Sequence, residues 1–269
     1  MLDAFTELAG GLDHPEGIAW APDGALYAGG EAGQVYAIGL DGSVAQIAST
    51  DGFMYGLAVD GASTVYACDF GNAAVARIDG AGDVSWHSRG TDDRPMRVPN
   101  AAAFDEGGAL FVTDSGEWAA DDGTIFRVEP DGTTRVWSDA APAFPNGCCL
   151  SLEGDALLVI ESHARRVVRI PFADDGSAGT PEVVVELPGS QPDGLALASD
   201  GTMIVGCYRP DRLWIVRPGE EPEILAEDPD GVVLNQPANP CFVGPELDRL
   251  AVSSLGGWSI MWADIGLKG

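Results

Sequence analysis

Short apolar runs alternate with turns along this chain, and no stretch has a long helical period. In the first fifty residues the apolar runs are 18–20, 25–28, 34–38 and 44–47, and turns such as Pro22-Asp23-Gly24 and Asp41-Gly42 separate them. Gly and Asp tolerate the positive φ angles that tight hairpins need. The pattern therefore predicts four short antiparallel strands that follow one another in sequence order.

This four-strand unit recurs, and a short motif marks the start of each copy. In most copies a polar residue follows Pro and precedes Gly or another small residue. The six motif positions are Glu16, Tyr55, Asn100, Asn146, Asp193 and Asn239, which are 39 to 47 residues apart. A strand-filled period of this length is typical of a propeller blade. The sequence therefore predicts an all-β, six-bladed β-propeller with four-stranded antiparallel blades.

The last repeat is one strand short. It supplies runs 241–243, 250–253 and 259–262, whereas residues 4–8, which lie before the first motif, resemble the missing outer strand. If this N-terminal strand joins the last blade, the ring closes and an exposed sheet edge disappears. We expect residues 1–269 to form one such propeller domain.

Composition fits a compact protein with many turns. The chain is 45% hydrophobic and contains 36 Gly and 18 Pro. It has no apolar run long enough to span a bilayer, and its start lacks the basic and apolar regions of a secretory signal. We therefore expect a cytoplasmic protein that does not associate with membranes, as a monomer or weak homodimer.

Charge excludes one class of partner. The formal net charge is −28 and Lys268 is the only lysine, so no basic surface is available to bind nucleic-acid phosphates. The charge is interpreted as a solvated acidic surface, for which adaptation to a salt-rich habitat is one cause, and a specific cationic partner is the alternative.

The five cysteines show no metal-binding spacing, and all but Cys149 fall on or beside predicted strands. They are interpreted as buried, reduced thiols.

The motif positions carry the candidate chemistry. Each polar residue precedes the predicted innermost strand, so its side chain is expected at the mouth of the central channel. Glu16 and Asp193 provide carboxylates there, and Asn100, Asn146 and Asn239 provide amide oxygens. Two bare carboxylates in a dry channel would repel each other, whereas Ca²⁺ binds six to eight oxygen ligands. Turn formation alone is the alternative, but Glu is a poor turn residue.

Five segments along the chain resemble motifs of the senescence-marker-protein, gluconolactonase and luciferin-regenerating-enzyme family of six-bladed propellers. They are residues 14–17, 97–100 leading to 112–116, 144–147 leading to 161–163, 191–194 leading to 206–208, and 253–258. The resemblance extends from about Glu7 to Asp264. Each motif is weak by itself, but five in the same order are specific.

The resemblance implies a divalent cation, most often Ca²⁺, with Zn²⁺, Mn²⁺ and Mg²⁺ as alternatives. Glu16, Asn146 and Asp193 match its ligands, and Asn100 matches a residue near the metal or the substrate. Family members hydrolyse sugar lactones, other lactones or organophosphate esters. In the lactonases an Arg two residues before this Asn often contacts the sugar, whereas here Arg97 lies three residues before it.

These residue types predict a metal-dependent hydrolase that opens a small-molecule lactone. Asp193 is the expected general base, and Glu16 and Asn146 are the expected metal anchors. The residues expected to contact substrate are Asn100, Arg97, Tyr55, Trp118, His163 and Tyr208. Two alternatives remain: a phosphotriesterase in which Asp193 attacks phosphorus, and a non-catalytic ligand-binding propeller.

Overall fold

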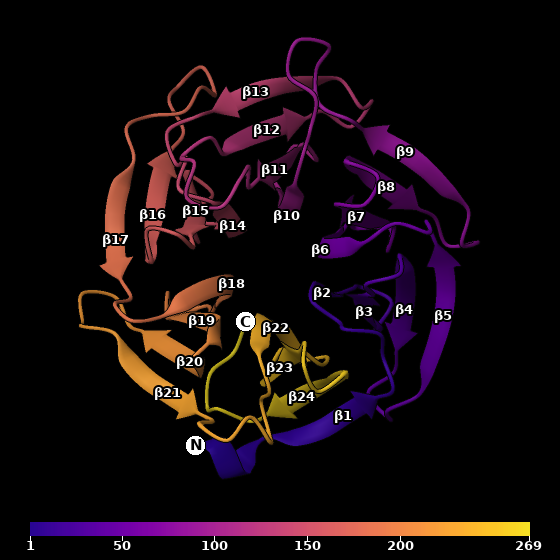
Figure 1. Ribbon diagram of the computed structural model, residues 1–269, viewed down its shortest axis with the longest axis vertical. Helices are drawn as coiled ribbons and strands as arrows, with labels where there is room; N and C mark the ends of the chain where they lie inside the picture. Colours follow the sequence, from indigo (N-terminus) through magenta and orange to yellow (C-terminus); the bar gives the residue numbers. More distant parts are fainter.

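Six four-stranded antiparallel sheets surround a central axis (Figure 1). A computed structural model describes all residues 1–269. In blades 1 to 5 the strands follow sequence order from the inner edge to the outer edge of the sheet. This arrangement confirms the predicted six-bladed propeller.

The first five blades are defined by their strands. Blade 1 contains β2 (Ile18–Trp20), β3 (Leu26–Gly29), β4 (Gln34–Ile38) and β5 (Val44–Ser49). Blade 2 contains β6 (Met54–Val59), β7 (Val65–Asp69), β8 (Ala74–Ile78) and β9 (Val84–Ser88). Blade 3 contains β10 (Pro99–Phe104), β11 (Leu110–Asp114), β12 (Thr124–Val128) and β13 (Thr134–Ser138). Blade 4 contains β14 (Pro145–Leu150), β15 (Ala156–Glu161), β16 (Arg166–Pro171) and β17 (Glu182–Glu186). Blade 5 contains β18 (Gln191–Leu197), β19 (Met203–Arg209), β20 (Asp211–Val216) and β21 (Glu223–Glu227).

Blade 6 closes the ring with strands from both ends of the chain. It contains β22 (Pro237–Val243), β23 (Arg249–Ser254), β24 (Ser259–Ala263) and the N-terminal β1 (Thr6–Gly10), which pairs antiparallel with β24. The predicted closure is therefore confirmed. The strand begins at Thr6 rather than Ala4, because Leu2–Ala4 form a short 3₁₀ turn whose hydrogen bonds occupy the N–H groups of Ala4 and Phe5.

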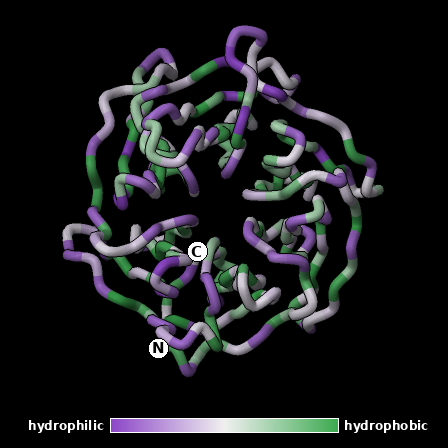
Figure 2. Tube along the Cα trace, in the orientation of Figure 1, coloured by the Kyte–Doolittle hydropathy of each residue, from purple (hydrophilic) through white to green (hydrophobic).

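The core consists of six apolar clusters, one between each pair of neighbouring blades. Between blades 1 and 2, for example, Val35 and Leu57 belong to one cluster, and Phe5 reaches the cluster between blades 5 and 6. Figure 2 shows hydrophobic stretches in the strands of the blades and hydrophilic stretches in many of the loops. Burial between blades therefore holds the ring together. No helix has the length and apolar character that crossing a bilayer requires.

The five cysteines are free thiols, but only Cys68 and Cys207 are buried, whereas Cys148, Cys149 and Cys241 are partly exposed, so the prediction of five buried thiols is wrong for these three. Cys149 lies inside β14, so the prediction that it falls outside a strand is wrong. Successive strand residues point to opposite faces. Accordingly, Cys148 packs on the cluster between blades 3 and 4, and Cys149 packs on the cluster between blades 4 and 5.

The motif glycines allow inner strands of successive blades to touch. A Cβ added to Gly17 would lie 2.1 Å from the carbonyl oxygen of Tyr55, and one added to Gly56 would lie 2.4 Å from that of Asn100. At Gly147 the corresponding distance to the next motif carbonyl is 2.6 Å. Real Cβ atoms do not come this close to backbone, so any larger residue would push neighbouring blades apart.

We predict that Gly56→Ala lowers the free energy of unfolding by at least about 2 kcal/mol, because its methyl group overlaps the β10 backbone. Gly61→Ala is the matched control, since a Cβ there meets no atom within 4 Å. Denaturant unfolding monitored by circular dichroism measures both. Equal stabilities of the two variants would contradict the close-contact explanation.

Candidate functional site

The motif side chains are held by interruptions in the inner strands. Pairing between β14 and β15 jumps from Pro145 to Cys148, which leaves Asn146 in the irregular segment. A similar break in β18 contains Asp193. Such bulges redirect side chains. Glu16 precedes β2 as predicted, whereas the other motif residues lie within their strands, so that part of the prediction is wrong.

Buried hydroxyl groups fix the motif backbones from the preceding blade. The donors lie in the second strand of a blade or directly after it. The hydrogen bonds are Ser253 Oγ to Glu16 O at 2.6 Å, Ser162 Oγ to Pro192 O at 2.6 Å, and Thr113 Oγ1 to Asn146 O at 2.8 Å. Because these groups are shielded from water, each bond is costly to lose. The motifs are therefore anchored rigidly.

Two carboxylates lie together in this buried ring. Glu16 is 8% exposed and Asp193 is 3% exposed, and Asp193 Oδ1 has no hydrogen-bond partner. Burial, followed by the negative charges of Asp193 and Glu31, raises the pKa of Glu16 well above its ordinary value. Burial also raises the pKa of Asp193 to about 7, and the neighbouring Asn146 amide acts in the opposite direction. In the protein alone, these carboxyl groups therefore resist ionisation.

The Asn146 amide and the phenols of Tyr55 and Tyr208 lie near the carboxylates, and Asn100 is a buried residue of the neighbouring blade 3. Asn100 and Asn146 are each 4% exposed. Burial raises the pKa of Tyr55, and the charge of Glu16 adds to the rise. Burial and then the charge of Asp193 raise the pKa of Tyr208 to about 12. Both phenols therefore keep their protons at neutral pH and can donate hydrogen bonds.

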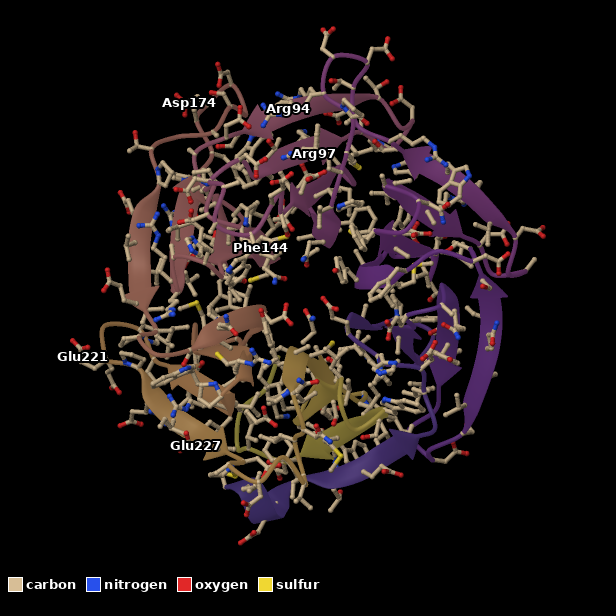
Figure 3. All side chains as sticks on the ribbon, viewed as in Figure 1. Arg94, Arg97, Phe144, Asp174, Glu221 and Glu227 are labelled. Atoms are coloured by element: carbon tan, nitrogen blue, oxygen red, sulfur yellow. The ribbon has the colours of Figure 1, made fainter.

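Three aromatic rings from loops of blades 3 and 4 form a group. The ring centroid of Trp118 lies 4.9 Å from that of Phe144 and 5.4 Å from that of His163. Figure 3 shows Phe144 near the central opening. The structure thus brings the predicted Trp118 and His163 together, and Phe144 joins them.

Arg97 is occupied by a loop of its own blade. Its guanidinium lies 2.7 Å from Asp122 Oδ2 and donates to the carbonyl oxygen of Asp122 at 2.9 Å. The loop between β11 and β12 that contains Asp122 also carries Trp118. Figure 3 places Arg97 over blade 3, farther from the centre than Phe144. Arg97 therefore orders this loop. A direct contact between Arg97 and the substrate remains a prediction.

His14 was absent from the candidate residues, yet it connects the first and last blades beside the site. Trp258 Nε1 donates to His14 Nε2 at 3.0 Å, so the neutral ring carries its proton on Nδ1. His14 Nδ1 lies 2.8 Å from Glu31 Oε2 and 3.1 Å from Asp13 Oδ1. The pair Asp13-His14 directly before Pro15-Glu16 is the sequence signal that could have identified it.

The chain belongs to the SMP-30/Gluconolactonase/LRE-like family, whose characteristic region matches residues 82–256, more than half of the chain. Residues 4–38 also match the N-terminal region of strictosidine synthase-like proteins. A search of curated proteins finds no match.

Several solved structures share the fold. A gluconolactonase from Xanthomonas campestris aligns with a TM-score of 0.83 at 19% identity, covering 98% of this chain and 89% of that one. A luciferin-regenerating enzyme aligns with a TM-score of 0.77 at 18% identity, covering 97% and 94%. Regucalcin from Agrobacterium tumefaciens, a calcium-binding protein, gives 0.77 at 19% identity, covering 100% and 94%.

The donor types of the four candidate ligands fit a hard divalent cation. All the candidate donors are oxygen atoms: the carboxylates of Glu16 and Asp193 and the amides of Asn100 and Asn146. The unpartnered Asp193 Oδ1 offers a buried lone pair for coordination. A dication would also offset the repulsion between the two carboxylates.

We predict that, in chelator-treated protein, Asp193→Asn gains stability over the wild type as pH rises from about 4 to about 7. The folded-state pKa of Asp193 lies above its unfolded value, so wild-type stability is fully present below the unfolded pKa and is lost as pH rises through the folded pKa. The melting temperature of the variant should exceed that of the wild type by at least about 3 °C at pH 8, the shift for roughly 1 kcal/mol in a chain of this size. A difference that does not change with pH would contradict this account.

Proposed function

We propose that this protein is a divalent-metal-dependent lactonase. The observation that carries the proposal is the buried pair Glu16 and Asp193, with its unpartnered Asp193 oxygen and the buried Asn146 amide beside Asp193. Membership of the family supports it, as do structural relatives whose titles name a gluconolactonase and a calcium-binding protein.

Glu16, Asn100, Asn146 and Asp193 would hold the cation, and their all-oxygen donor set suits Ca²⁺ best. When bound, such a cation supplies Lewis acidity toward a lactone carbonyl and positive charge opposite the developing oxyanion. Histidine and cysteine are absent from the four donors, which disfavours Zn²⁺.

Asp193 accepts a proton from the water that attacks the lactone carbonyl. The water oxygen bonds to the carbonyl carbon while the carbonyl double bond opens to an oxyanion. When the carbonyl forms again, the ring carbon–oxygen bond breaks and the proton passes to the departing ring oxygen. The product is an open hydroxy acid. Tyr55 and Tyr208, which keep their protons, donate hydrogen bonds to the substrate. Trp118 and Phe144 cover the lactone ring and limit access of bulk water.

A phosphotriesterase is the second candidate. The free Oδ1 of Asp193 has no internal hydrogen bond to break before it attacks an electrophile. In that reaction Asp193 would form a bond to phosphorus while the aryloxide leaves, and water would then release the phosphoryl group.

Added Ca²⁺ should raise the melting temperature of chelator-stripped protein progressively with concentration, because it binds only the folded state. We predict that Glu16→Gln removes more than half of this increase, since it replaces one carboxylate of the pair. Glu221→Gln is the control, because Glu221 is exposed at the periphery of the molecule (Figure 3). The metal site would be refuted if metal analysis finds no divalent ion and if none of Ca²⁺, Mg²⁺, Mn²⁺ and Zn²⁺ raises the melting temperature.

Sugar-acid lactones, aliphatic lactones and an aryl phosphotriester should be tested by acid release, with and without chelator. We predict metal-dependent hydrolysis of at least one lactone. Asp193→Asn should lower its kcat at least about a hundredfold because the general base is lost. Asp174→Asn, at an exposed outer turn, is the control.

The panel also separates the alternatives. Cleavage of the phosphotriester alone would favour the second candidate. Bound metal without any hydrolysis would favour a ligand-binding propeller. Unchanged turnover by metal-loaded Asp193→Asn would place the base elsewhere.

A further inference from the structure

Basic side chains are scarce in this protein, and most are neutralised. The sequence has fourteen Lys and Arg against forty-two Asp and Glu. The eight basic residues that form ion pairs are Arg94, Arg97, Arg127, Arg166, Arg169, Arg212, Arg217 and Lys268. Arg89 and Arg249 instead lie over the rings of Trp86 and Trp262.

Two of the remaining arginines line the same pocket. Arg165 and Arg209 are both exposed, neither forms an ion pair, and together they border a pocket of about 230 Å³ between blades 4 and 5. The rest of its lining is Gly189, Ser190, Gln191 and Pro210, so no carboxylate faces it. Two like charges placed together repel each other. In so acidic a chain, an arginine pair without a carboxylate indicates a place for an external anion.

The pocket lies beside the candidate site. Gln191 is the strand partner of Arg209 and stands two residues before Asp193, at the start of the irregular segment of β18 that contains Asp193. Arg209 directly follows Tyr208, one of the two phenols near the carboxylates. The N–H of Arg165 donates to the carbonyl of Ser162 at 3.3 Å.

The Gln191 side chain adds an unsatisfied polar group to the pocket. Its Oε1 is buried without a hydrogen-bond partner. As an acceptor, this oxygen can take a hydrogen bond from a ligand hydroxyl, whereas an anionic group would bind the two guanidinium groups. Planar guanidinium groups bind carboxylate and phosphate with paired hydrogen bonds.

We propose that this pocket binds a carboxylate or phosphate group carried by the substrate, while the lactone ring lies at Asp193. This inference rests on the proposed lactonase function and narrows it to lactones with an anionic side chain. A net charge of −28 repels such molecules at long range, so their binding requires a local positive pair of this kind.

Direct binding tests the pocket without using catalysis. Glutarate and inorganic phosphate are titrated into chelator-treated protein at constant ionic strength, by calorimetry. We expect at least one of them to bind, and the Arg165→Gln/Arg209→Gln double variant to bind it at least about tenfold more weakly, the scale of one charge-assisted hydrogen bond. The tighter anion identifies which group the pocket prefers. Arg135→Gln removes another exposed, unpaired arginine and should bind as the wild type does.

Three outcomes would overturn the proposal. Neither anion binds the wild type, the double variant binds as tightly as the wild type, or the double and Arg135→Gln variants lose affinity equally. Melting temperatures of all variants, measured by circular dichroism, identify any that lose binding through misfolding.

Paired substrates test the link to the reaction. Two lactones with the same ring, one neutral and one with a carboxylate side chain, are compared by kcat/KM. In the double variant the ratio of the anionic to the neutral substrate should fall at least about tenfold, mainly through KM. An unchanged ratio would overturn the substrate role. If the wild type hydrolyses neither lactone, the lactonase function fails, and the binding experiment still decides whether the pocket holds anions.

Discussion

Contact between the backbones of neighbouring inner strands is the constraint on which the site depends. At Gly194, as at the other motif glycines, an added Cβ would overlap the next motif, lying 2.2 Å from Asn239 Oδ1. This spacing leaves no room for a larger residue at the motif glycines, so the inner strands stay close together. Glu16 and Asp193, which adjoin two of these glycines, are therefore buried close to each other.

The ring combines favourable and unfavourable contributions to stability. Apolar clusters between blades bury residues such as Leu26 and Phe111 completely, and this burial stabilises the fold. Two carboxylates buried side by side oppose it, because each raises the free energy of the other's charged form. A proton or a dication relieves the same repulsion. In the proposed enzyme, pH and metal occupancy would therefore be linked at Asp193, since both ligands compete for its oxygens.

Local sequence signals were sufficient to predict the blades and the motif ring. Turn residues and strand alternation are signals that act within a few residues. The spacing of the repeated motif placed Glu16, Asn146 and Asp193 at equivalent positions of their blades. Contacts between loops could not be read in this way. Pairing of Arg97 with Asp122 and of Trp258 with His14 depends on how loops fold over the mouth. The bulges were missed because they arise from pairing with the neighbouring strand.

The arginine pair Arg165 and Arg209 could be recognised as a candidate site only in the structure. Arg165 lies in the turn after β15, whereas Arg209 is the last residue of β19, so the two do not occupy the same position of the repeat and the period gave no signal for the pair. Their significance emerged only when the structure showed which other basic residues are neutralised. Charge is therefore distributed unequally around the mouth: Glu16 and Glu31 belong to the side of blade 1, and the unpaired arginines to blades 4 and 5. In the proposed complex this asymmetry would orient a substrate, because its anionic end is attracted to the arginines and repelled by the acidic side, which leaves the neutral ring ester at Asp193.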